Sequence, residues 1–419
     1  MNIIMFSVGS EGDIRPHIAL GKELTRRGHH ITISAFASFE KTVLDSGLAF
    51  SPISGSAMDM INNLLKSGSD VFRFFLQARK VIRDLSSGIL ADAEKNCRDA
   101  DAIICTFAGN TFHSIAEKYK IPCIQTQYFP MDPNPEMPIA FLPALGNSRL
   151  WNLLSYRIGY AFISLMEICY VSPWRKKQGL PRKGFHTKPD YRVGKNRIPV
   201  IYNCNPPLFP HPDNWSSNIY TTGEWLEKTA TEYTPSPELT AFLNAGEKPV
   251  CIGFGSTVSE NMEKTFRLIC EAVDKASVRA IILGGWSGFR KEDLPENIFC
   301  MDRAPHDWLF RQVCAAVHHG GAGTTKSSLR AGLPTLIIPF GNDQPFWGAR
   351  VHACSCGPKP LHRKKLTADA LAERLRDLTQ NEAYRKNAAA LGEKMRSENG
   401  VSEAADIIEK ELAEWKPCD

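Results

Sequence analysis

The amino-acid sequence predicts an α/β protein with two Rossmann-like domains, each built on a parallel β-sheet covered by helices. Short apolar runs alternate with helical patterns over residues 2–127, an order typical of parallel sheets. A proline-rich stretch over residues 203–249 interrupts this alternation, which restarts at Val250. With 419 residues, the chain is long enough to bury two separate cores.

The first half of the chain contains apolar runs of strand length at residues 2–8, 30–35, 102–106 and 122–127. Helical patterns occupy residues 14–27, 39–46, 57–75, 77–97, 110–119 and 150–171. Gly28 and Gly47 follow two of these helices, and glycine is a common helix stop. We therefore expect one parallel sheet with helices on both faces in this half.

The second half repeats the alternation. Strands are expected at residues 250–254, 280–283, 298–301, 315–318 and 335–339. Helices are expected at residues 261–276, 324–332, 367–378, 382–398 and 402–415. The two halves are alike in this coarse pattern, and no short repeat is present.

Composition describes an ordinary cytosolic protein. A net charge of +5 permits anionic ligands or a membrane surface and does not demand nucleic acid. The 12 cysteines are scattered without a Cys-x-x-Cys pair, so we expect reduced thiols. The first residues lack the basic region of a signal peptide, and the apolar stretch at 158–172 is short and contains Glu167.

The most informative segment is a glycine loop between a strand and a helix. Gly320, Gly321 and Gly323 precede the helix expected to open at Thr324. Glycines let the backbone approach a ligand, and a helix start offers unpaired N–H groups that suit a phosphate. A histidine ends the strand, and Asp-Gln follows the next strand. Together these residues indicate a site for a phosphate and a polyol, hence a nucleotide sugar.

This segment resembles the donor-binding signature of the UDP-glycosyltransferase superfamily, in the branch of sterol 3-beta-glucosyltransferases and glycopeptide-antibiotic glycosyltransferases. Residues 303–310, Arg-Ala-Pro-His-Asp-Trp-Leu-Phe, and residues 357–361, Gly-Pro-Lys-Pro-Leu, are similar to the same branch. The resemblance implies the GT-B architecture, in which two facing Rossmann-like domains with parallel sheets enclose a cleft. The N-terminal domain would bind the acceptor and the C-terminal domain the nucleotide sugar.

The architecture implies domain limits that fit the proline-rich join. We expect an acceptor domain at residues 1–215, a linker at 216–248 and a nucleotide-sugar domain at 249–395. The last residues, 396–419, would form a helix that packs back on the N-terminal domain.

The resemblance also assigns donor-binding roles. His319 would contact phosphate, the glycine loop would hold the diphosphate without a metal, and the Asp-Gln pair would bind sugar hydroxyls. The expected donor-binding residues are Ser256, Arg303, His306, His319, Gly321, Ala322, Gly323, Thr324, Asp343 and Gln344. Arg303 and Ser327 stand where plant members have tryptophan and glutamate, which leaves uridine and thymidine both open. UDP-glucose is the expected co-substrate, and no other cofactor is expected.

The loop at residues 9–17, Gly-Ser-Glu-Gly-Asp-Ile-Arg-Pro-His, follows the first strand and resembles the acceptor-side loop of the same branch. Its aspartate, Asp13, takes the position of the catalytic histidine of plant members and would deprotonate the acceptor hydroxyl. Spacing alone favours a helix cap for Asp13, and His17 is the rival base. The residues expected near the acceptor are Ser10, Phe72, Asn110, Phe129, Met131 and Phe141.

We therefore expect an inverting hexosyltransferase acting on a lipophilic alcohol such as a sterol, triterpenoid, flavonoid or macrolide. The apolar residues 150–171, followed by a basic run, suggest contact with an anionic membrane surface. Two alternatives remain: a nucleotide-sugar epimerase of the same fold, and a non-catalytic regulatory relative.

Overall fold

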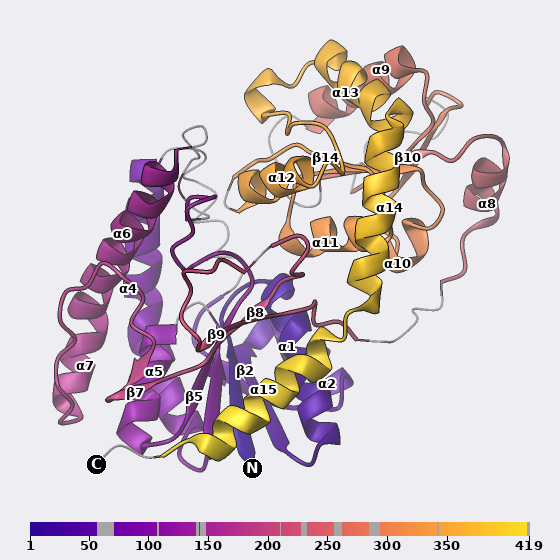
Figure 1. Ribbon diagram of the computed structural model, residues 1–419. Coiled ribbons are helices and arrows are strands. Elements are labelled where there is room, and N and C mark those ends of the chain that lie inside the picture. Colours follow the sequence, from indigo (N-terminus) through magenta and orange to yellow (C-terminus); the bar gives the residue numbers. More distant parts are fainter. Residues whose placement is uncertain are drawn as a thin grey trace. The chain divides into compact units, whose positions relative to one another are not determined.

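The computed structural model describes residues 1–56, 71–106, 109–139, 142, 148–209, 211–227, 233–254, 262–284, 294–341 and 343–416. Two compact units are present: Met1–Glu227 joined by Glu398–Asp419, and Lys228–Ser397 (Figure 1). Each unit contains a parallel sheet with helices packed on it. The predicted α/β class with two Rossmann-like sheets is confirmed.

The first unit contains a seven-stranded sheet in the order β3-β2-β1-β4-β5-β8-β9, parallel throughout. Its strands are β1 (Asn2–Ser7), β2 (His30–Phe36), β3 (Ala49–Ile53), β4 (Ala102–Cys105), β5 (Cys123–Gln127), β8 (Val200–Asn203) and β9 (Ile219–Thr222). A small antiparallel pair joins β6 (Arg192–Val193) to β7 (Asn196–Arg197). Its helices are α1 (Glu11–Arg26), α2 (Glu40–Asp45), α4 (Val71–Asn96), α5 (Gly109–Tyr119), α6 (Arg149–Met166), α7 (Ser172–Lys177) and α15 (Gly400–Glu414).

The two faces of this sheet bury different helices because successive residues of a strand point to opposite sides. On β1, Ile3 and Met5 lie in a core cluster with residues of α1 and α15. Ile4 and Phe6 lie in another cluster with residues of α4 and α5. The continuous apolar run at residues 2–8 is thus explained by burial on both faces.

The last helix, α15, packs beside α1 although nearly the whole chain separates them (Figure 1). Arg27, just after α1, donates to Asp406 Oδ1 at 2.5 Å and Glu409 Oε2 at 2.7 Å. Ala404 and Ile408 of α15 are fully buried in the α1 core cluster. Apolar burial and a partly buried ion-pair network therefore fix this helix.

The second unit contains a five-stranded parallel sheet in the order β12-β11-β10-β13-β14. Its strands are β10 (Val250–Gly253), β11 (Ala280–Leu283), β12 (Ile298–Met301), β13 (Ala315–His318) and β14 (Thr335–Ile337). Its helices are α8 (Pro237–Asn244), α9 (Met262–Ala276), α10 (His306–Leu309), α11 (Ala322–Arg330), α12 (Gln344–Ala353), α13 (Ala368–Gln380) and α14 (Glu382–Ser397). Helices α9 and α13 pack together and bury one face of the sheet.

Some elements differ from the sequence prediction. Strand β3 was not predicted from the sequence, and strand β9, like helix α8, lies within the expected linker. Both strands are edges of the sheet, where short, half-exposed sequences give a weak apolar signal. The helix expected at 150–171 is divided, because a π-helical turn over Glu167–Val171 follows α6. The helix that was predicted to break near residue 76 is continuous in α4.

The start of α15 provides a stability test. A Cβ added to Gly400 would lie 2.2 Å from the backbone of Gly223, which cannot rotate away. Gly400→Ala should therefore lower the free energy of unfolding by about 1–3 kcal/mol, despite the higher helix propensity of alanine. Urea unfolding of the full chain measures this change. Gly184→Ala, where the added atom meets nothing within 4 Å, is the matched control; equal stability of the two variants would contradict the prediction.

Candidate functional site

In both sheets the chain reverses its direction of strand addition beside a central strand. In the first sheet the reversal lies between β1 and β4, and in the second between β10 and β13. Parallel α/β sheets bind ligands at the carboxyl ends of strands at such switch points. The predicted acceptor loop follows β1, and the predicted donor loop follows β13. The topology alone thus places both loops at ligand-binding positions.

Asp13 lies in the first turn of α1, the helix that directly follows β1. Its Oδ2 accepts hydrogen bonds from the Ser10 backbone N–H at 2.7 Å and from the Ser10 hydroxyl at 3.0 Å. The Ser10 hydroxyl in turn accepts from the Gly12 N–H, so the two side chains form a capping box. Gly9 leaves the necessary space, because a Cβ there would lie 2.2 Å from Asp13 Oδ2. The carboxylate is half-buried and held in one orientation.

His17 lies one turn further along α1 and is fully buried. Its Nδ1 is bonded to the Ser7 hydroxyl, and its Nε2 lies 3.0 Å from Thr126 Oγ1. Burial lowers the pKa of His17 to about 3. The imidazole is therefore a neutral core group with both nitrogens bonded, and the geometry favours Asp13 over this rival base.

The turn from β13 into α11 depends on Gly320. This residue has φ of +92°, and an added Cβ would lie 2.5 Å from Ile337 Cγ2 and 3.2 Å from the Gln344 carbonyl oxygen. Gly321 is the extended N-cap, so α11 begins at Ala322 and not at Thr324 as predicted. Ala322, Gly323 and Thr324 therefore form the first helical turn, whose N–H groups have no partner within the helix.

The two histidines at the end of β13 have different roles. His318 is buried; its Nδ1 accepts from the Gly320 N–H at 3.1 Å, and its Nε2 lies 3.3 Å from Ser328 Oγ. His319 Nδ1 is buried, and no group in the described part of the chain bonds to it. Burial lowers the pKa of His319 to about 4, so its ring is neutral near pH 7. His318 supports the glycine turn, while His319 presents an unsatisfied ring nitrogen.

A cavity of about 220 Å³ opens at this end of the second sheet. Four predicted donor-binding residues line it: Arg303, His306, His319 and Thr324. His306 opens α10, and its ring stacks on Phe310 with centroids 4.7 Å apart. A ring-lined recess beside a helix N-terminus suits a flat base joined to phosphates.

Asp343 and Gln344 begin α12, after β14. Asp343 Oδ2 accepts from the Trp347 indole N–H at 2.7 Å, and burial raises the pKa of this carboxyl group. Gln344 Oε1 accepts from the backbone N–H groups of Phe340 at 2.7 Å and Gly341 at 3.2 Å. Both side chains are thus fixed at the carboxyl end of the second sheet.

A mainly apolar cavity of about 130 Å³ lies in the first unit. Met131, Tyr160, Ile163 and Met166 supply apolar wall, and Gln125 and Gln127 supply polar groups. Of the predicted acceptor residues, Met131 lines this cavity, and Phe129 packs against the adjoining core cluster. Tyr128, between Gln127 and Phe129 in the chain, connects this region to the Asp13 loop. Its hydroxyl donates to the Asp13 carbonyl oxygen at 3.1 Å.

For four predicted site residues, the structure describes either nothing or only the backbone. Ser256 and Phe141 lie outside the described residues. Phe72 and Asn110 lie on α4 and α5, and the structure describes only their backbone. The structure thus brings together the donor residues near β13 and, separately, Ser10 with Asp13.

Several residues that line the two cavities were not predicted from the sequence. His318 lines the 220 Å³ cavity together with His319. Gln125 and Gln127 line the smaller cavity, and they belong to a strand whose sequence indicates only burial. The only signal for them was polarity within an apolar run.

Comparison with known proteins agrees with this arrangement. Residues 3–137 match the glycosyltransferase family 28 N-terminal domain, and residues 274–411 match the erythromycin biosynthesis protein CIII-like C-terminal domain. A sterol 3-beta-glucosyltransferase of Debaryomyces hansenii is 33% identical over 98% of this chain, and the match covers 27% of that protein. The chain thus spans about a quarter of the length of this curated relative.

Solved structures share the fold across the whole chain. A structure of the glycosyltransferase of kitacinnamycin has a TM-score of 0.74 at 19% identity, covering 98% of this chain and 99% of that chain. The glycosyltransferase VinC, in complex with dTDP, has a TM-score of 0.71 at 18% identity, covering 99% and 100%.

The buried state of His17 predicts a pH dependence of stability. The folded pKa of His17, about 3, lies below the usual imidazole value of 6.5, so below pH 6.5 the unfolded chain binds a proton that the folded chain excludes. Burial of the neutral His17 therefore contributes fully to the free energy of unfolding above pH 6.5. This contribution falls by about 1.4 kcal/mol per pH unit as the pH drops from 6.5 toward 3. Urea unfolding between pH 7 and 5 should show a shallower loss for His17→Gln than for His30→Gln, which changes an exposed histidine. Equal slopes would refute this assignment.

Proposed function

We propose that this chain is an inverting, metal-independent hexosyltransferase, because residues 3–137 match a glycosyltransferase family 28 N-terminal domain and residues 274–411 match an erythromycin biosynthesis protein CIII-like C-terminal domain. The donor is UDP-glucose, and the acceptor is a hydroxyl of a lipophilic alcohol of the sterol, triterpenoid, flavonoid or macrolide type. One observation carries this proposal: the neutral His319, with a buried unpaired nitrogen, lies beside the first turn of α11 in a cavity at a switch point.

The donor side would bind and then stabilise the leaving diphosphate. A neutral His319 ring can donate one N–H to a phosphate oxygen, and the adjacent negative charge would strengthen that bond. The N–H groups of the first turn of α11 would hold the remaining phosphate oxygens. As the bond between the anomeric carbon and the diphosphate breaks, negative charge grows where these donors lie.

Asp343 and Gln344 would bind hydroxyl groups of the sugar. Their contacts to Trp347 and to the 340–341 backbone fix their orientation before a ligand arrives. Preorganised polar groups of this kind favour one arrangement of hydroxyls over another. The choice of glucose rests on this pair and on the glucosyltransferase relative.

The acceptor side would supply the base. The acceptor oxygen attacks the anomeric carbon from the face opposite the diphosphate, and its proton passes to the Asp13 carboxylate. The capping box holds that carboxylate in place, so the aspartate serves as both helix cap and base. The apolar cavity around Met131 would hold the carbon skeleton of the acceptor.

The surface of α6 favours contact with a membrane that supplies such an acceptor. Leu150, Leu154, Ile158 and Leu165 are exposed on one face of this helix, with Leu150 83% exposed. Residues 149–166 contain two arginines and no acidic residue. No helix that the structure describes is long and apolar enough to span a bilayer. We propose that α6 rests on the anionic inner surface of the cytoplasmic membrane.

The decisive measurement is UDP release from UDP-glucose with and without a mixed panel of sterol, flavonoid and macrolide alcohols. Asp13→Asn should lower the acceptor-dependent rate by about 10²- to 10⁴-fold. Asparagine retains an oxygen that can accept from the Ser10 N–H, so the melting temperature should stay within a few degrees. Glu11→Gln, which alters an exposed carboxylate in the same helical turn, is the matched control.

Three outcomes would each contradict a different part of this proposal: the base, the transfer reaction or catalysis itself. Full activity of Asp13→Asn would remove the base assignment. Conversion of UDP-glucose to another nucleotide sugar without acceptor would identify an epimerase. The chain would instead be a non-catalytic relative if it binds UDP-glucose but transfers sugar to no acceptor, either from UDP-glucose or from dTDP-glucose.

Membrane contact has a separate test. The full chain should pellet with vesicles of anionic phospholipid at low salt and remain soluble with zwitterionic vesicles. The double substitution Leu154→Glu and Ile158→Glu should abolish pelleting, because it places two carboxylates on the apolar face. Leu44→Glu, at an exposed leucine of α2, should leave pelleting unchanged. Equal pelleting of the α6 variant and the control would rule out this face.

A further inference from the structure

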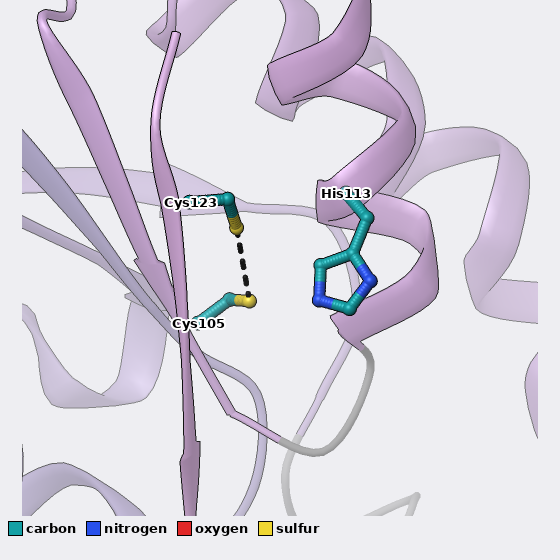
Figure 2. Close-up of side chains that lie close together, drawn as sticks. All are labelled: Cys105, His113 and Cys123. Carbon is teal, nitrogen blue, oxygen red and sulfur yellow. Dashed lines mark hydrogen bonds between the residues drawn. The ribbon is translucent and has the colours of Figure 1, made fainter. Parts of the chain in front are cut away.

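A group of metal-ligating side chains lies in the first unit, apart from the residues assigned to glycosyl transfer. Cys105 ends β4, Cys123 begins β5, and His113 lies on α5, the helix that connects the two strands. All three side chains are buried, and Figure 2 shows them converging from the sheet and the helix. Their sulfur atoms and a ring nitrogen lie within 4.8 Å of one another.

The strand register explains this convergence. Cys105 pairs with Gln125, and Ile103 pairs with Cys123, so the two cysteines lie two positions apart on neighbouring parallel strands. Side chains two positions apart share a face of the sheet. Helix α5 covers that face as the crossover between β4 and β5, and its His113 points at the sulfurs (Figure 2).

Gln125 adds an oxygen to the same group. Its Oε1 lies 3.1 Å from His113 Nε2 and 3.5 Å from Cys105 Sγ. Its Nε2 donates to the carbonyl oxygens of Thr106 at 2.7 Å and Thr126 at 3.2 Å. Those two bonds fix the amide orientation, so the oxygen, and not the nitrogen, faces the cysteines and the histidine.

The separations approach those of a tetrahedral zinc site. With Zn–S near 2.3 Å and Zn–N or Zn–O near 2.1 Å, ligand sulfurs lie about 3.8 Å apart, sulfur and oxygen about 3.6 Å, and nitrogen and oxygen about 3.4 Å. The corresponding separations here are 3.7, 3.5 and 3.1 Å. The histidine nitrogen and the sulfurs lie within 4.8 Å of one another, so reaching the ideal separation of about 3.6 Å requires a movement of at most about 1.2 Å.

Charge balance also favours a divalent cation. Two thiolates neutralise one divalent ion, while the imidazole and amide add no charge, so the occupied site would be neutral in a buried setting. Zinc would bind by displacing one proton from each cysteine. Gln125 also lines the 130 Å³ cavity, which gives an ion a route inward.

We propose that Cys105, His113, Cys123 and Gln125 Oε1 bind one zinc ion, which fixes α5 to β4 and β5. The role is structural, because sulfur, nitrogen and oxygen donors fill four positions. The site shares Gln125 with the wall of the proposed acceptor cavity, and zinc content is measured separately from glycosyl transfer.

The test begins with the unmodified full chain, produced in zinc-supplemented medium. Elemental mass spectrometry should find about one zinc per chain after exhaustive dialysis. Exchange for cobalt should produce the near-ultraviolet absorption of thiolate-to-cobalt charge transfer, and chelation should lower the melting temperature. A chain without zinc and without cobalt absorption would overturn the proposal, as would an intact mass that reveals a Cys105–Cys123 disulfide.

Variants separate the site from adventitious binding. Cys123→Ser and His113→Asn should each lower zinc content at least tenfold, while Cys97→Ser should retain it. Cys97 is buried in the same core cluster and is not one of the four ligands, so it is a matched control. Equal zinc content in the Cys97 and Cys123 variants would also overturn the proposal. If a ligand variant fails to fold, cobalt absorption of the unmodified chain still decides the question.

Discussion

The proposed donor site in the second unit depends on a steric constraint at Gly320. The end of β13 must turn within one residue and pass against β14 and the start of α12, which leaves no room for a Cβ. Glycine also permits the positive φ that this turn requires. The turn then brings the His319 ring and the N–H groups of α11 to one end of the cavity. The position of every proposed phosphate contact follows from this close approach.

In the first unit, which would bind the acceptor, a strand and a helix also meet at a switch point, but the helix has a different cap. Both β1 and β13 end at a switch point and are followed almost immediately by a helix. In α11 the cap is a glycine without a side chain, which leaves the first-turn donors open to an anion. In α1 the Ser10–Asp13 capping box fills that position, so an anion is excluded and a carboxylate is presented instead. Similar backbones thus suit opposite chemical tasks.

The sequence predicted the fold class and most buried strands because these features have strong local signals. β11, β12 and β13 were predicted to the residue, since each is a short, mostly apolar run in the alternation of strands and helices. The edge strands β3 and β9 were missed because they are short and only partly buried, so their sequences lack a clear apolar run. Spacing alone favoured a helix cap for Asp13 and could not reveal a second role as a base, because both roles need a carboxylate at the same position.

The behaviour of the histidines shows a further limit of sequence reading. His17, His113, His318 and His319 are all deeply buried, yet their roles differ according to what each ring nitrogen meets. His17 satisfies both nitrogens within the core, and His318 supports a turn. Of the two neighbouring histidines at the end of β13, only His319 has a buried nitrogen without a partner in the described chain. Hydrogen-bond satisfaction, and not burial, is therefore what distinguishes His319, the proposed phosphate ligand, from the core histidines His17 and His318.

The cysteines illustrate why tertiary metal sites escape motif searches. Zinc motifs recognised from sequence hold two ligands within a few residues, on a turn or one helical face. Cys105, His113 and Cys123 are separated by most of a βαβ unit, so spacing gives no such signal. The parallel register places the two cysteines on one face, and the crossover helix must cover that face to bury it. Any βαβ unit with ligands at the facing ends of its strands and on its crossover helix can assemble such a site without a local motif.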